Sequence, residues 1–243
     1  MMAGQALTYG DKIIPFRVVC DPSRTSRIAI HVDPDGSVIV DAPSDAPDEL
    51  IHRAVRKRAR WIVRHVEAAE NRYRHVQPRE YVSGEQVLYL GRRYVLKVII
   101  SERANRSVKL AAGRLEVRTE DTAPGAVRAR LRAWYRFHAQ DYFHRRIGDI
   151  SAGLPWVNTP PPLQLLEMTR QWGSCSTSGQ IILNPHLVKA PREAVDYVII
   201  HELIHIKVHD HSPEFTALLG QYMPDWRSTK RSLDAMVEVF LTE

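Results

Sequence analysis

The residues best suited to chemistry lie in one stretch near the C-terminus: His201, Glu202 and His205 form an H-E-x-x-H pattern, and His211 follows. Residues i and i+4 share one face of a helix, so His201 and His205 can direct imidazole nitrogens at the same ion. Imidazole suits Zn²⁺, and a catalytic zinc site takes three protein ligands and leaves a fourth position to water. The pattern therefore predicts a zinc centre with Glu202 beside it.

A third zinc ligand is needed, and the nearby candidates are His211 and His209. Ser212 and Pro213 have the features of a helix start, an N-cap residue followed by a proline in the first turn. The chain must therefore turn before Ser212. Such a turn can bring His211 back to the metal, whereas His209 would fit only if the first helix continued. His211 is the favoured ligand, and a downstream glutamate such as Glu238 is a further alternative.

The segment that leads into this pattern, residues 194–200, is almost entirely apolar and predicts a buried helix. Burying a polar group without a partner costs roughly 1–3 kcal/mol, and a charge costs more. A bound metal would remove that cost. The competing interpretation is a chance pattern on a core helix whose histidines bond to the backbone, and the well-placed third histidine argues against it.

Two separated motifs resemble those of a known family. The stretch from His201 to Phe215 resembles the active-site segment of the YgjP-like zinc metallopeptidases, which are relatives of the SprT-like proteases. Upstream, residues 170–176 read R-Q-W-G-S-C-S, and together with a strand that ends at Asn184 they resemble the second signature of that family. The similarity runs from about residue 24 to about residue 233.

This resemblance implies a zincin-like domain with Glu202 as the catalytic base. The zinc ligands that it implies are His201, His205 and His211. The chain departs from the family pattern at Asp210, where the family often has asparagine, and at Thr216, where it often has tryptophan. Both departures would change the rim of the pocket without removing a ligand.

The expected activity is hydrolysis of peptide bonds by a metal-activated water. Glu202 would accept a proton from that water and pass it to the leaving amine. An extended peptide substrate could add as a strand at a sheet edge near residues 181–184. A nucleophilic Ser174 or Cys175 is a less favoured alternative. The candidates for stabilising the oxyanion are Tyr222, His209 and Arg227.

A second hypothesis, from a different class, is a basic protein that binds nucleic acid or protein and keeps a structural or vestigial metal site. The net charge of +6 and the pI near 9.4 permit such contacts without establishing them. The intact Glu202 argues against this hypothesis, because a structural site needs no base beside an open coordination position.

The compartment expected from the sequence is the cytoplasm. No apolar run approaches the length of a membrane span, and residues 1–7 lack the basic and apolar regions of a signal peptide. Cys20 and Cys175 lie far apart in sequence, so no disulfide framework is indicated.

The strand and helix patterns predict an α+β fold with two domains, 1–120 and 121–243. The first is expected to be a small antiparallel sheet built from hairpins, with one helix over about 48–72. The second is expected to be a zincin-like metallopeptidase domain that opens with a long helix over about 126–150. No internal repeat stands out. The expected strands are 13–20, 27–32, 37–40, 87–90, 94–100, 108–110, 115–117, 163–168 and 180–183.

The helix expected over 48–72 combines an apolar stripe with many cations. The apolar positions are Leu50, Ala54, Val55, Ile62 and Val66, with Trp61 beside them. The cations are Arg53, Arg56, Lys57, Arg58, Arg60 and Arg64. The favoured interpretation is a solvated face whose aliphatic stems cover apolar surface. The alternative is a surface for phosphates or an acidic partner, although the aromatic interleaving typical of nucleic-acid modules is not evident.

Overall fold

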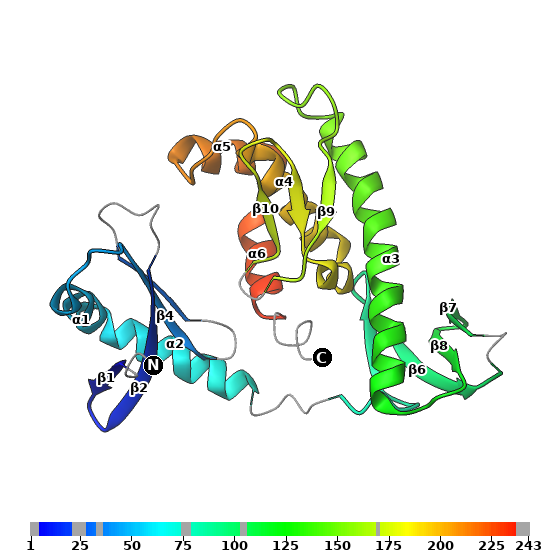
Figure 1. Cartoon of the computed structure of the whole chain (residues 1–243). Helices are drawn as coiled ribbons and strands as arrows, with labels where there is room; N and C mark the ends of the chain where they lie inside the picture. The colour runs from blue at the N-terminus through cyan, green and yellow to red at the C-terminus, as the bar shows by residue number, and fades with distance from the viewer. Residues whose placement is uncertain are drawn as a thin grey trace. The chain divides into compact units, whose positions relative to one another are not determined.

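The chain forms two compact units, Met1–Gln77 and Pro78–Glu243, in a computed structural model that describes residues 5–20, 28–32, 36–73, 79–102, 106–168 and 171–236 (Figure 1). The domain boundary expected between residues 120 and 121 therefore falls inside the second unit. The physical reason is a shared core: the strands before residue 120 bury their apolar side chains together with the helices that follow.

The first unit contains a four-stranded sheet in the order β1 (Gln5–Tyr9), β2 (Lys12–Cys20), β4 (Val38–Ala42) and β3 (Ala29–Val32). The neighbours β1 and β2 are antiparallel, as are β3 and β4, but β2 and β4 run parallel. The sheet is therefore mixed rather than antiparallel throughout, because two hairpins are joined through strands that point the same way. Strand β1 was not among the expected strands.

Two helices, α1 (Asp48–Lys57) and α2 (Ala59–Tyr73), pack on this sheet where one helix was expected. Arg58 separates them, with φ −107° and ψ 11°. Its amide donates to the carbonyl of Val55, three residues back, at 3.1 Å, which tightens the turn. Leu50, which was assigned to the apolar stripe, is 44% exposed, whereas the neighbouring Ile51 is buried.

The second unit begins with a sheet of the same topology as the first. Its order is β5 (Gln86–Tyr89), β6 (Arg92–Ile100), β8 (Arg114–Thr119) and β7 (Ser107–Ala111), with β6 and β8 parallel and both outer pairs antiparallel. In both units a helix follows the last of the four strands in the chain: α1 follows β4, and a helix also follows β8. The chain therefore contains a repeated ββββα module, which the sequence patterns did not reveal.

The long helix α3 (Pro124–Ser151) belongs to the second module and continues along the rest of the second unit (Figure 1). Its expected span, about 126–150, is confirmed. It carries buried residues at intervals along its length, among them Leu131, Phe143 and Ile147. These contribute to one core with the sheet β5–β8 and with the helices that carry the candidate site, so α3 fixes the site to the second module.

A small three-stranded sheet stands beside the candidate site in the order β10 (Gly173–Cys175), β11 (Ile181–Leu183) and β9 (Leu163–Leu165). Strand β11 is central, since it pairs antiparallel with β10 and parallel with β9. Strand β10 is at the edge of this sheet. The remaining elements are the 3₁₀ helix η2 (Pro185–Lys189) and the helices α4 (Arg192–His205), α5 (Pro213–Tyr222) and α6 (Trp226–Asp234).

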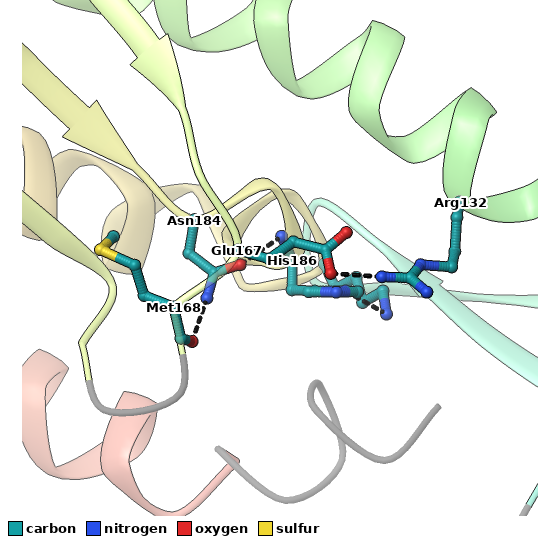
Figure 2. A network of polar contacts seen from close by, with 6 residues as sticks. Arg132, Glu167, Met168, Asn184 and His186 are labelled. Atoms are coloured by element: carbon teal, nitrogen blue, oxygen red, sulfur yellow. Dashed lines mark hydrogen bonds and ion pairs between the residues drawn. The ribbon is translucent and has the colours of Figure 1, made fainter.

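The end of β11 is anchored by Asn184, the last residue of the second sequence motif, which is 1% exposed. Its amide nitrogen donates to the carbonyl of Met168 at 2.8 Å, and its side-chain oxygen accepts from the backbone of His186 at 3.1 Å (Figure 2). These bonds cap η2 and fix the chain where it turns toward α4. Asn184 thus has a structural role next to the candidate site.

Two contacts fix α4 from outside. Arg146 on α3 makes a bidentate ion pair with Asp196, at 2.9 and 3.0 Å, and this pairing raises the pKa of the guanidinium. The indole of Trp156 donates to the carbonyl of Leu203 at 3.0 Å, near the C-terminus of the helix.

Among the helices of the described residues, none is both long enough and apolar enough to span a membrane.

Candidate metal centre

Helix α4 is buried on almost every side, as its apolar sequence predicts, and it ends at His205. The chain then turns, with the amide of Val208 donating to the carbonyl of Ile204 at 2.9 Å. Helix α5 begins after Ser212, whose hydroxyl accepts from the backbone of Phe215 at 3.5 Å. The expected helix stop and the expected N-cap are therefore confirmed.

This turn brings His201, His205 and His211 together. Each offers one ligand atom, and the three atoms all lie within 4.8 Å of one another. The Nε2 atoms of His201 and His211 are 3.0 Å apart. Tetrahedral zinc with Zn–N bonds of about 2.0–2.1 Å places its ligand nitrogens roughly 3.3 Å apart, which is close to the His201–His211 separation. The three imidazoles together form a group that could hold one ion. His209 lines the same cleft but does not belong to this group.

The electrostatics of the cluster favour neutral imidazoles, the form that coordinates metals. Burial, followed by the charges of His205 and His211, lowers the pKa of His201 to about 3. Burial also lowers the pKa of His205. The Nδ1 atom of His205 lies 3.0 Å from the carbonyl oxygen of Val208, which directs Nε2 toward the cluster. The Nδ1 atom of His201 is buried and has no hydrogen-bond partner in the described part of the chain.

Phe215 forms a platform under the three histidines. Its ring centroid lies 4.8 Å from that of His201, 4.7 Å from that of His205 and 4.8 Å from that of His211. The side chain is 2% exposed. Phe215 therefore restricts the rotamers of all three imidazoles through packing, a role that the sequence motif did not reveal.

Glu202 is 5% exposed, and burial raises its pKa to about 8. Its side chain packs against Gly173 of β10. A Cβ atom placed on Gly173 would lie 2.7 Å from Oε1 and 2.8 Å from Cγ of Glu202, closer than real Cβ contacts allow. The side chain of Glu202 can therefore occupy this position only if residue 173 is glycine. The two sequence motifs meet at this contact.

A cleft of about 540 Å³ contains both the histidine cluster and Glu202. One wall is formed by residues 171–177, which include β10, and another wall by α4. Tyr197 of α4 also lines the cleft, although the sequence reasoning did not identify it. Helix α6 contributes Lys230, Leu233 and Asp234. Of the three oxyanion candidates, His209 is among the described residues that line the cleft, whereas Tyr222 and Arg227 are not.

The thiol of Cys175 also lines the cleft, and its hydrogen-bond contact is with the carbonyl of Ser176, at 3.5 Å. Burial and the charge of Glu202 raise its pKa. A thiol with a raised pKa stays protonated, and only the thiolate is a strong nucleophile. This environment disfavours the alternative of a cysteine nucleophile. Arg170 of the second motif and Glu238, the alternative ligand, lie outside the described residues.

Comparison with known proteins places the chain in a family and gives similar solved structures. Residues 26–236 match the family model described as "YgjP-like, metallopeptidase domain". Two crystal structures of metallopeptidase zymogens are similar to the chain. Jannalysin of Methanocaldococcus jannaschii is 23% identical, with a TM-score of 0.34, over 37% of this chain and 92% of that chain. Abylysin of Pyrococcus abyssi is 22% identical, with a TM-score of 0.33, over 40% of this chain and 92% of that chain. No curated protein matches the chain.

Proposed function

The chain belongs to the YgjP-like family of metallopeptidases, and from this premise we propose that it is a zinc-dependent peptidase. The zinc ligands in this proposal are His201, His205 and His211, and Glu202 is the general base. The observation that carries it is the meeting of three imidazole nitrogens within 4.8 Å and a buried carboxylate in one cleft. A metal with an open position beside a carboxylate is the arrangement that metal-assisted hydrolysis uses.

When bound, Zn²⁺ acts as a Lewis acid toward the scissile carbonyl and lowers the pKa of water in its coordination shell. Glu202 accepts a proton from the attacking water at a carboxylate oxygen and later delivers it to the leaving amine. The low exposure of Glu202 keeps bulk water away from that carboxylate. Gly173 holds the carboxylate in place on the side of β10.

The substrate in this proposal binds as an extended strand along β10. From the sequence, the substrate strand was expected to add near β11. Strand β11 is central in the sheet, however, and its two edges are occupied by β10 and β9. Within the described sheet, β10 has one edge unpaired and its residues line the cleft. Adding a strand to a free edge satisfies the backbone of the peptide without demanding particular side chains. The expected position near 181–184 is therefore corrected to 173–175.

The proposal is tested by removing and restoring the metal. The purified protein should contain about one zinc per chain, and a proteome-derived peptide library, read by mass spectrometry, should reveal its cleavage products. Depletion with a chelator should abolish cleavage, and added Zn²⁺ should restore it. Metal saturation should also raise the melting temperature, since ligand at 100 times its Kd stabilises the folded state by about 2.7 kcal/mol. Undiminished cleavage by metal-depleted protein would refute the proposal.

The Gly173 contact leads to a separate prediction. Gly173→Ala should reduce kcat/KM by roughly 10- to 100-fold, because the new methyl group displaces Glu202, and an error of about 1 Å in a reacting group can cost about 10²-fold. Zinc content should stay near one per chain, since the atoms nearest to the new methyl group belong to Glu202 and not to a histidine. Gly148→Ala is the matched control, because a Cβ at that helical position meets nothing within 4 Å. Equal activity of both variants would show that Glu202 does not depend on Gly173.

A further inference from the structure

A basic pocket lies in the first unit, where α1 gives way to α2. Its volume is about 540 Å³, and its lining residues are Lys57, Arg58, Arg60, Trp61 and Arg64. The four cationic side chains are exposed, and none has an ion-pair partner within the described part of the first unit. No carboxylate is among the lining residues, so the pocket concentrates positive charge around one indole ring.

The indole is held in place by its own helix. The ring of Trp61 lies against that of His65, with centroids 4.2 Å apart and an interplanar angle of 32°. The Nδ1 atom of His65 is 2.8 Å from the carbonyl oxygen of Trp61. Trp61 is half-buried and packs against the core of the first unit. It therefore offers a fixed aromatic surface to the pocket rather than a freely rotating one.

A similar stack elsewhere in the chain shows that the cations are not needed to build one. In the second module, Trp134 and His138 on α3, also four residues apart, form a similar stack with centroids 4.2 Å apart and an interplanar angle of 49°. The cations are not repeated in the same way. Counted from the tryptophan, the counterparts of Arg58, Arg60 and Arg64 are Leu131, Ala133 and Phe137. The Trp–His stack is thus common to both modules, whereas these three arginines are not required to build one.

We propose that this pocket binds single-stranded nucleic acid, with the cationic side chains on backbone phosphates and Trp61 against a base. Guanidinium groups bind phosphate through paired hydrogen bonds, and aromatic rings stack on bases of any sequence. An acidic peptide would use the cations but not the indole. A duplex keeps its bases stacked inside the helix, so an unpaired strand suits the pocket better. Such binding is additional to peptide hydrolysis and does not depend on the metal centre.

The test uses the full chain and fluorescence anisotropy with labelled oligo-dT and oligo-rU of about 15 nucleotides, a length that covers the usual site sizes. The wild type should bind in low salt, and the two probes distinguish DNA from RNA as the source of the strand. Arg60→Gln/Arg64→Gln should weaken binding at least 10-fold. It should also reduce the slope of log K against log salt by about 1.4, since each phosphate contact on a single strand contributes about 0.7.

The matched control is Arg92→Gln/Arg93→Gln, which removes the same charge from an exposed position in the second unit. It should bind within about twofold of the wild type if the pocket, rather than the net charge, recognises the strand. Trp61→Leu should weaken binding by about 5- to 100-fold, the range expected for loss of one stacked base, and leave the salt slope unchanged. Melting curves should confirm that each variant is folded.

Three results would overturn the proposal. The first is absence of binding by the wild type at about 50 mM salt, where phosphate contacts are strong. The second is equal loss of affinity in the pocket variant and in the control, which would indicate a nonspecific effect of charge. The third is tighter binding of a polyglutamate peptide than of the oligonucleotides, with no effect of Trp61→Leu, which would assign the pocket to acidic proteins.

Discussion

Replacing Glu202 with glutamine should reduce peptide hydrolysis by roughly 10²–10⁴-fold or more, the usual scale for loss of a general base. Glutamine is nearly isosteric with glutamate and fits beside Gly173, but its amide cannot accept the proton of the attacking water. The fold should persist, because the neutral amide avoids the cost of burying a charge at a position that is 5% exposed. The zinc content should also stay near one per chain, because no ligand is removed.

The measurement compares kcat/KM of the two proteins on a peptide that the wild type cleaves, together with their zinc content. Glu193→Gln is the matched control, since it makes the same chemical change at an exposed position in the first turn of α4. It should keep wild-type activity. If Glu202→Gln turned over the peptide at the wild-type rate with a full complement of zinc, Glu202 could not be the base.

The parts of the candidate site that the sequence could predict are those set by spacing along a single segment. His201 and His205 are one helical turn apart, and Ser212 and Pro213 mark the start of the next helix, so the turn that brings His211 to the cluster follows from local signals. These signals do not depend on knowing how the rest of the chain folds. The histidine cluster in the structure has the members that this reasoning selected.

Contacts between distant segments could not be predicted in this way. The contact between Gly173 and Glu202 joins two motifs across the cleft, and the Phe215 platform depends on how α5 packs against α4. Neither leaves a periodic pattern in the sequence. Trp61 lies in a helix whose cations were interpreted as a solvated face, and only the structure shows it lining the same pocket as they do.

The fold shows the same distinction. The hairpins β3–β4, β5–β6 and β7–β8 could be predicted from alternating residues and a turn, but the hairpin of β1 with β2 was missed because β1 was not expected. The parallel pairings of β2 with β4 and of β6 with β8 join hairpins to one another and depend on tertiary packing. The repeated module was hidden because its two copies share few residues. They have in common an Ala-Pro pair at the start of the helical part and a Trp–His stack.

The sharpest test of the metal centre separates His211 from its neighbour His209. His211→Ala should weaken zinc binding by more than roughly 100-fold, beyond the 10- to 100-fold loss typical of residues that only orient a ligand. His205→Ala should have an effect of similar size, because two histidines make an incomplete site. His209→Ala should retain zinc, since its side chain lines the cleft outside the ligand cluster, and should alter activity modestly.

Titration of each variant with Zn²⁺ against a competing chelator measures these affinities, and melting curves without metal show whether the variants fold. Glu238→Gln belongs in the same series, because a downstream glutamate is the other possible third ligand. Loss of zinc in Glu238→Gln with retention in His211→Ala would assign the third position to the glutamate. Loss of zinc in His209→Ala with retention in His211→Ala would mean that the turn after His205 has a different path in the metal-bound protein. Loss in His211→Ala alone among these three variants is the result expected from the 3.0 Å approach of its Nε2 atom to that of His201.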